Sequence, residues 1–365
     1  MSVRKWLVPL FCAALGLAQA PGDKVASTPL PVAETGPFAL PQEVKEFVQH
    51  TTLSQYSTQA KLRALMEAVF RSPEEGGLGM TYDNSRTRTV AEVWRDRKAN
   101  CLSLTAFYVA SCRAVGIPAL YADSVGVNRW SRKGSLICFE RHVVAVVPMP
   151  PVDNLVADFV PQLQRGVHHL DLLPENRVLA LFHSNRAVEL LQEHDPTAAL
   201  EEAKCSLKVD EKSGVGWNIL GVVQRDLGLE TDAEASFLKA LDLDAKDGAA
   251  CGNLETLMQD TNRPELAAHY RDLGMKLRAK DPYFHAFLAL EAYHGGNMES
   301  ARDEVKAAIK LLPYEPDFYV LLAQLQVAKG EKDDAIKTLE RAKRWSIPAE
   351  RQRLDSKLAL LQSKL

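Results

Sequence analysis

The sequence predicts an α+β domain followed by an all-α solenoid of helical hairpins. Residues 42 to about 175 have the patterns of helices followed by an antiparallel sheet, and from residue 180 a helix-only pattern repeats every 34 residues. The apolar fraction of 46% and the charged fraction of 25% are those of an ordinary globular protein. A net charge of −3 argues against nucleic-acid binding, which usually requires a basic excess.

The first twenty residues contain the three parts of a secretory signal. Arg4 and Lys5 form a positive start, 6–17 is an apolar run, and 18–20 is an A-x-A cleavage pattern. A short buried helix is the alternative interpretation. We predict a signal peptide at 1–20 and an exported protein, periplasmic or secreted, with no membrane span after cleavage.

The cysteines favour a free thiol over a disulfide framework. Cys12 lies in the apolar run and lacks the small preceding residue of a lipidation site, so a cleaved product is favoured over a lipoprotein. The other five cysteines are an odd number, which leaves at least one thiol unpaired or shared between chains. Cys101 and Cys112 are predicted to share one helix about 16 Å apart, too far for a bridge.

Local patterns predict the elements of the first domain in order. The prolines of 21–41 predict an extended linker. Helical periodicity follows at 42–50 and 58–71, a capping box of Thr89 and Glu92 predicts a short helix through Arg97, and a long apolar helix spans Cys101–Val115. Gly116 and Pro118 end that helix. Runs rich in Val and Ile predict strands at Ala119–Val127, Ser135–Phe139, His142–Val147 and Leu155–Val160.

Small residues recur at fixed places in the second domain. One set, 34 residues apart, is Ala199, Ala233, Ala267, Ala301 and Ala335. A turn position five residues earlier holds His194, Gly228, Asn262, Gly296 and Gly330. An earlier position holds Leu220, Leu254, Leu288 and Leu322, with Arg186 breaking the series. Small residues let the two helices of a hairpin approach closely, so this pattern predicts five repeats at 180–349 and a capping helix at 350–365.

This part resembles the tetratricopeptide repeat. The clearest unit is 214–247, with Trp217, Leu220, Gly221, Gly228, Ala233, Phe237 and Ala240 in the family's places. The resemblance implies a groove that binds a protein or peptide partner. Candidate groove residues are Asn218, Arg225, Tyr283 and Tyr293, although they do not form the lysine-and-asparagine clamp of some such repeats, and Tyr293 could instead pack between hairpins.

Three residues of the first domain could form a nucleophilic site. Cys101 begins a predicted helix, where the positive end of the helix dipole favours a thiolate. His142 opens a predicted strand, and Asp158 lies on the next one. A cysteine nucleophile needs an imidazole to take its proton, and the imidazole needs a carboxylate to orient it. Asp153 is the rival acid, but the adjacent prolines suggest a loop.

The surrounding segments resemble the core of the transglutaminase-like superfamily, a papain-like fold. The resemblance rests on 99–103, on 110–119, and on His142 and Asp158 in the family's order. It implies that Cys101 is the nucleophile, His142 the general base and Asp158 the orienting acid. The context departs from many members, because Leu102 and two further residues replace an acidic or glycine-rich stretch after the cysteine. The combination with helical repeats looks closer to a bacterial subgroup in which the cysteine is sometimes absent.

Further residues bear on the chemistry of this site. The oxyanion donors would be the backbone N–H of Cys101 and a second group, for which Asn100 is a candidate, although a polar residue before a helix is more often a cap. Trp94 is expected in the core. His168, His169 and His183 lack the spacing of a metal site, and no acidic loop suggests calcium, so we expect no metal and no cofactor.

Two functions of different classes follow. The first is a cysteine hydrolase or acyl transferase acting on amide bonds, with repeats that bind a protein. The second is an inert scaffold in which the repeat groove alone has a role and Cys101 is a buried core thiol. The geometry of Cys101, His142 and Asp158 discriminates between them.

Overall fold

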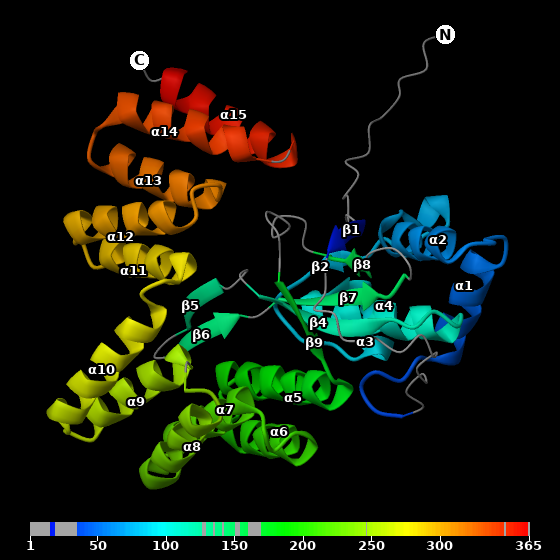
Figure 1. The fold of residues 1–365 in the computed structure, drawn as a ribbon, viewed down its shortest axis with the longest axis horizontal. Helices are drawn as coiled ribbons and strands as arrows, with labels where there is room; N and C mark the ends of the chain where they lie inside the picture. Colours follow the sequence, from blue (N-terminus) through cyan, green and yellow to red (C-terminus); the bar gives the residue numbers. More distant parts are fainter. Residues whose placement is uncertain are drawn as a thin grey trace. The chain divides into compact units, whose positions relative to one another are not determined.

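The computed structural model describes residues 15–18, 35–125, 129–133, 136–140, 142–149, 154–159, 169–245, 247–346 and 348–363 (Figure 1). The chain divides into two compact units, which we describe separately. The N-terminal unit comprises Phe11–Val127 and Arg141–Ala267. The C-terminal unit contains Asn128–Glu140 and Ala268–Leu365.

The first helices begin and end close to the predicted positions. They are α1 (Gln42–Thr52), α2 (Thr58–Phe70), a 3-10 turn (Pro73–Glu75), α3 (Val90–Asp96) and α4 (Cys101–Ala114). The predicted capping box is present, since the Thr89 side chain accepts from the backbone N–H of Glu92 and the Glu92 side chain accepts from that of Thr89. Gly116 has a φ of +77°, the left-handed conformation typical just after a helix.

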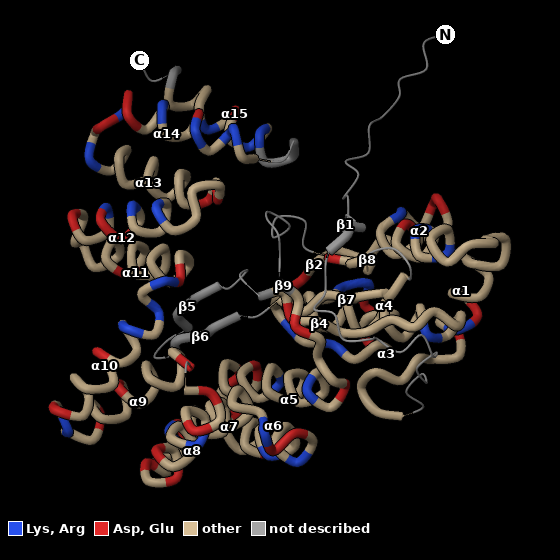
Figure 2. The backbone as a smooth tube through the Cα atoms, viewed as in Figure 1, with Lys and Arg blue, Asp and Glu red and all other residues tan. Residues whose placement is uncertain are grey.

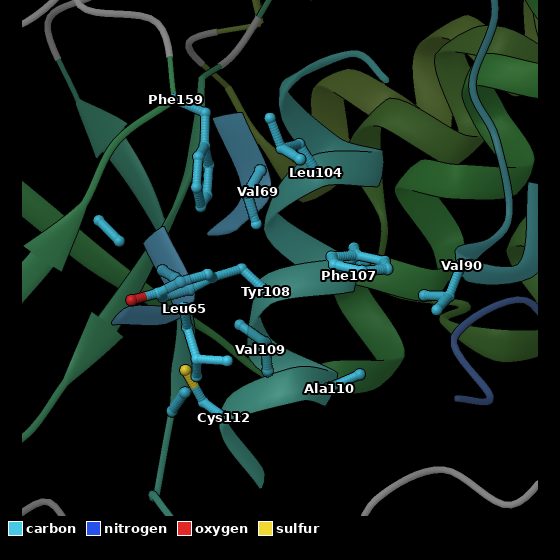
Figure 3. Packing of buried hydrophobic residues seen from close by; sticks show 14 of the residues in the cluster. Leu65, Val69, Val90, Leu104, Phe107, Tyr108, Val109, Ala110, Cys112 and Phe159 are labelled. Atoms are coloured by element: carbon cyan, nitrogen blue, oxygen red, sulfur yellow. The ribbon is translucent and has the colours of Figure 1, made fainter. Parts of the chain in front are cut away.

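Helix α4 lies at the centre of the core. Its residues are buried on all sides from Leu102 to Arg113, as expected of a helix without a polar face. Figure 3 shows Phe107, Tyr108 and Val109 pointing from α4 into surrounding apolar side chains, with Phe159 above Tyr108. The Tyr108 hydroxyl donates to the Leu62 carbonyl of α2 at 3.0 Å. This packing fixes the position of the first residue of the helix.

A five-stranded antiparallel sheet packs against α4. Its order is β1-β8-β7-β4-β9, and the strands are β1 (Leu15–Ala18), β4 (Leu120–Val125), β7 (Val143–Val147), β8 (Asn154–Ala157) and β9 (His169–Leu173). Val143, Ala145 and Val147 of β7 face the core with α4, whereas Val144 and Val146 face a smaller cluster with Ala122 and Leu170. Two short pairs complete the strands: β2 (Thr81–Tyr82) with β3 (Lys98–Ala99), and β5 (Arg129–Lys133) with β6 (Leu136–Glu140).

Some local expectations differ from the structure. Strands β5 and β9 were not predicted, because each depends on a partner strand: β6 for the former and β4 for the latter. The predicted linker 21–41 is not free throughout, because Phe38 and Leu40 are buried in the core and Val90 donates to the Pro37 carbonyl at 2.8 Å. An extended segment can still bury alternate side chains.

The strand β1 lies inside the predicted signal peptide. It pairs with β8, with Leu15 opposite Ala157 and Ala18 opposite Asn154. The remainder of the predicted signal, 1–14 and 19–20, and linker residues 21–34 lie outside the described residues. Cleavage after residue 20 would remove β1 from the edge of the sheet, so export remains a prediction from the sequence.

Helical hairpins begin within the N-terminal unit. The helices are α5 (Glu175–Gln192), α6 (Pro196–Val209), α7 (Gly214–Asp226), α8 (Glu230–Leu243), α9 (Gly248–Asp260) and α10 (Pro264–Arg278), and the unit ends at Ala267 of α10. The first helix begins five residues before the predicted start of the repeats at residue 180. Gly221 lets α7 approach α8, since a Cβ there would lie 2.7 Å from the ring of Phe237.

The C-terminal unit continues the hairpins. Its helices after α10 are α11 (Pro282–His294), α12 (Met298–Leu311), α13 (Pro316–Ala328), α14 (Lys332–Trp345) and α15 (Pro348–Ser363). Strand β5 lies against α11. Leu354 and Leu358 of α15 pack on the cluster formed by α13 and α14, which is the arrangement expected of a capping helix.

The predicted repeat period is visible in both units. The alanines at the 34-residue positions are buried, and all five predicted turn residues have positive φ: His194, Gly228, Asn262, Gly296 and Gly330. Figure 2 shows acidic and basic residues interspersed along α12. Among the described residues, no helix combines the length and the apolar character that a membrane crossing requires.

Candidate active site

Cys101 is the first residue of α4 and lies beside the histidine that the sequence predicted. The preceding Asn100 is the N-cap, and the Cys101 side chain is partly exposed. The Cys101 thiol lies close enough to the His142 imidazole to help raise the pKa of the imidazole. The first backbone N–H groups of a helix have no acceptor within the helix, so this end of α4 also presents hydrogen-bond donors.

His142 lies immediately before β7, and contacts on both sides fix its backbone. The carbonyl of His142 accepts from the Ser124 backbone N–H of β4 at 2.8 Å. The carbonyl of the next residue, Val143, accepts from Thr105 Oγ1 of α4 at 3.0 Å. Thr105 was not predicted as a functional residue, and it ties the helix that carries Cys101 to the strand that follows His142.

Asp158 lies immediately after β8 and completes the chain of contacts. Because β7 and β8 are antiparallel neighbours, the start of one and the end of the other lie at the same end of the sheet. His142 Nε2 and Asp158 Oδ1 are 2.7 Å apart, and both side chains are buried. Phe159, the next residue, packs its ring 5.3 Å from that of Tyr108 of α4 and so anchors the segment.

The surroundings favour the charged form of His142. Burial of the imidazole lowers its pKa, but hydrogen bonds with Asp158 and Cys101 and the charges of both partners outweigh burial and raise the pKa to about 10. At neutral pH the imidazole is therefore protonated. An imidazolium beside a cysteine stabilises the thiolate, which is the nucleophilic form. The arrangement can hold a thiolate–imidazolium pair with a carboxylate behind it.

Asn100 uses both ends of its amide in local hydrogen bonds. Its Oδ1 accepts from the Ser103 backbone N–H at 2.9 Å, and its Nδ2 donates to Thr87 Oγ1 at 2.9 Å. These contacts make Asn100 the cap of α4, which is the alternative role that the sequence indicates for it. Its role as an oxyanion donor stays a prediction.

The candidate groove residues have separate surroundings. Asn218 of α7 is buried and accepts from Asn253 Nδ2 at 2.9 Å, and Arg225 lies near Asp226 and Asp260 in partly buried surroundings that lower its pKa through desolvation. Tyr283 and Tyr293 belong to α11 of the C-terminal unit. Tyr283 Oη donates to Glu315 Oε2 at 3.2 Å, and the Tyr283 ring lies 5.3 Å from that of Phe318. The exposed Tyr293 ring lies 5.8 Å from that of His294.

The remaining candidates lie away from this arrangement or outside the described residues. Asp153 and His168 lie outside the described residues, and His169 is on β9. His183 of α5 has its Nδ1 2.7 Å from Glu202 Oε2 of α6. Trp94 packs against the core as expected, with its ring 5.5 Å from that of Phe47.

Comparison with known proteins supports both parts of the chain. A model of the transglutaminase-like superfamily matches residues 45–155, and a tetratricopeptide repeat model matches 216–247 and 316–346. Protein FlbA of Caulobacter vibrioides is 31% identical over 134 residues, which are 33% of this chain and 22% of FlbA. The chain thus spans about a fifth of that relative.

Solved structures with similar helical hairpins have low identity. YrrB, described as a tetratricopeptide repeat protein with an unusual peptide-binding site, is 21% identical with a TM-score of 0.28, covering 51% of this chain and 92% of YrrB. The Pseudomonas aeruginosa pilF protein is 15% identical with a TM-score of 0.31, covering 53% of this chain and 92% of pilF. The assignment therefore rests on the two family models. They identify a transglutaminase-like domain followed by tetratricopeptide repeats.

Proposed function

Because the chain carries a transglutaminase-like domain followed by tetratricopeptide repeats, we propose that it is a cysteine enzyme acting on amide bonds. One observation supports this above all: the buried His142 imidazole lies 2.7 Å from Asp158 Oδ1 and also interacts with Cys101. Each partner is of the type that its neighbour needs, a sulfur nucleophile, an imidazole and an orienting carboxylate. Cys101 is partly exposed, which further supports reaction with an external substrate.

The reaction begins with attack of the Cys101 thiolate on the carbonyl carbon of an amide. The C=O π electrons move to the oxygen, and the N-terminal N–H groups of α4 are the proposed donors to that oxyanion. When the C–N bond breaks, the His142 imidazolium gives its proton to the leaving amine. A thioester with Cys101 and a neutral His142 remain.

The thioester is resolved by a second nucleophile. Neutral His142 takes a proton from water or from an amine, which then attacks the thioester carbonyl and releases Cys101 as the thiolate. Water completes hydrolysis, and an amine completes acyl transfer. Asp158 keeps Nε2 of the imidazole engaged throughout, so that Nδ1 is the nitrogen left to exchange protons at the sulfur.

The repeats would bind the protein that carries the amide or a partner that delivers it. Tetratricopeptide repeats support protein binding as the role of this part. The predicted signal would place the reaction outside the cytoplasm. If Cys101 proves unreactive, the scaffold alternative remains, with the repeats as the functional part.

Alkylation of Cys101 tests the proposal directly. The full chain is treated with iodoacetamide at neutral pH, and the rate of label incorporation at Cys101 is followed by peptide mass spectrometry. His142→Ala should slow the reaction by roughly tenfold to a hundredfold, because a thiol without the imidazolium, at its ordinary pKa of about 8.5, is only a few per cent thiolate at neutral pH.

His183→Ala is the matched control. His183 is also a half-buried histidine beside a carboxylate, Glu202, but it lies on α5 and has no contact with Cys101 among its hydrogen bonds. This variant should label at the rate of the unaltered chain. Equal labelling rates for the unaltered chain and His142→Ala would overturn the enzyme proposal and favour the scaffold.

A further inference from the structure

We propose that the first repeat belongs to the catalytic unit, with Glu189 of α5 as a positioning residue for Cys101. The inference rests on the proposed function and goes beyond it, because it assigns part of the repeat array a role in the nucleophile's geometry. The proposal is based on a chain of contacts that runs from α5, through the segment before α3, to the N-cap of α4. All of these residues lie within the N-terminal unit.

Glu189 occupies a position of the 34-residue repeat at which the next repeat has an apolar residue. In the second hairpin, Leu220 and Val223 of α7 pack into one apolar cluster with the alanines of the preceding hairpin. The residues 34 positions earlier, on α5, are Arg186 and Glu189. In the part of the chain that the structure describes, the element before α5 is β9, and the face of α5 that would meet a preceding hairpin carries an ion pair in place of two apolar side chains.

Glu189 connects that face to the first domain. Its Oε1 accepts a hydrogen bond from the backbone N–H of Thr87 at 2.5 Å, and its Oε2 accepts from Arg186 Nη1 at 2.6 Å. The Glu189 side chain is only 14% exposed. Both carboxylate oxygens are therefore occupied, and a charge-assisted hydrogen bond of this kind is stronger than a neutral one.

Thr87 connects Glu189 to the start of α4 through hydrogen bonds. Its Oγ1 accepts from Asn100 Nδ2 at 2.9 Å, while Asn100 Oδ1 caps the helix through the Ser103 backbone N–H at 2.9 Å. Arg88, the next residue, donates its backbone N–H to Ser103 Oγ at 2.8 Å. Cys101 lies between Asn100 and Ser103 in this ring of contacts. Loss of the Glu189 carboxylate would leave the Thr87 N–H without its acceptor and loosen the cap.

Helix α5 is a rigid support for this contact. Val178 and Phe182 of α5 are buried in the same core as α4, and Arg113 Nη1 of α4 lies 3.1 Å from both carboxylate oxygens of Glu175. Because these anchors are independent of Glu189, we expect a substitution at Glu189 to leave α5 docked. Its effect should then fall on the segment at Thr87 and on the cap beyond it.

The test is the pH–rate profile of iodoacetamide alkylation at Cys101 in the full chain. Glu189→Ala should lower the rate at neutral pH by about 3- to 10-fold, the equivalent of one or two lost hydrogen bonds, and move the profile to higher pH. Glu189→Gln should recover most of the rate, because its amide oxygen can still accept from the Thr87 N–H. Glu193→Ala, an exposed carboxylate at the end of the same helix, is the charge-matched control and should not change the profile.

A second pair of variants covers the case in which Glu189→Ala does not fold. Thr87→Val keeps the backbone N–H and the side-chain volume but removes the oxygen that accepts from Asn100, so it should move the profile in the same direction. Thr87→Ser keeps that oxygen and should restore the pH–rate profile of the unaltered chain. Agreement between the two sites would support a single chain of contacts.

The outcomes separate this inference from the proposed function. If His142→Ala slows alkylation while Glu189→Ala and Thr87→Val leave the pH–rate profile unchanged, the positioning role is wrong and the enzyme proposal stands. A lower unfolding temperature with an unchanged profile would likewise overturn it, since that is the signature of a merely structural contact. If His142→Ala has no effect, the proposed function fails first and this inference with it.

Discussion

Cys101 and Cys112 lie at the two ends of α4 and have opposite surroundings. Cys101 begins the helix, is partly exposed and interacts with His142. Cys112 lies about three turns later and is completely buried. Desolvation raises the pKa of the Cys112 thiol far above its ordinary value, against weaker opposing effects of Tyr108 and Arg113.

The difference shows that reactivity depends on where along one helix a thiol lies. The N-terminal end of α4 meets the ends of two strands that carry polar side chains, His142 before β7 and Asp158 after β8. Cys112 lies among the apolar side chains of the core, in the cluster of Figure 3, and its interactions with Tyr108 and Arg113 are outweighed by burial. A buried thiol of that kind is inert, whereas a thiol beside an imidazolium is activated.

Among the substitutions that test this difference between the two cysteines, Asp158→Asn is expected to have the largest effect on the reactivity of Cys101. The neutral amide removes the negative charge that supports the His142 imidazolium, so the alkylation rate of Cys101 should fall about tenfold to a hundredfold, as for loss of a hydrogen bond to a charged group worth about 1.5–3 kcal/mol. Mass spectrometric labelling at neutral pH measures it. Asp171→Asn, an exposed carboxylate on β9 of the same sheet, should leave the rate unchanged.

A pH dependence of stability should follow from His142 itself. Its pKa of about 10 in the folded protein lies above the ordinary value of 6.5, so folding favours the protonated form. This stabilisation is complete below about pH 6.5 and is lost as the pH rises through about 10. Urea unfolding should therefore show a free energy of unfolding that decreases across this range.

The comparison variant for the pH dependence is His142→Gln, which cannot titrate. Other groups that ionise at high pH affect both proteins alike, so the informative quantity is the difference between the two curves. The unaltered chain should lose more stability than His142→Gln between about pH 6.5 and 10. Parallel curves would contradict an imidazolium held between Cys101 and Asp158.

The smallest effect is expected at the buried end of the helix. Cys112→Ala removes one sulfur from a packed site and should lower the free energy of unfolding by about 1 kcal/mol, measured by urea titration. The alkylation rate of Cys101 should stay as it is, and Cys112 itself should remain unlabelled in the folded chain. Rapid labelling at Cys112 would mean that α4 opens far more readily than its packing indicates.

The candidate site was only partly predictable from the sequence. The pattern of 101–115 predicts a helix that begins at Cys101, and the structure has α4 at Cys101–Ala114. The contact of His142 with Asp158 could not be derived that way, because it depends on β7 and β8 being neighbours, with both residues just beyond the paired strand ends. Glu189 left only an indirect signal, a carboxylate at a position where the next repeat has Val223.

The sequence by itself determined the features that depend on neighbouring residues. The 34-residue period places small residues between helices and residues such as Gly228 and Asn262 at turns with positive φ, and both follow from local sterics. Only the tertiary structure decided which distant segments meet: Phe38 with Phe182, Thr87 with Glu189, and the imidazole with its carboxylate. Such contacts form between residues far apart in the chain, so their partners are set by the packing of the whole N-terminal unit.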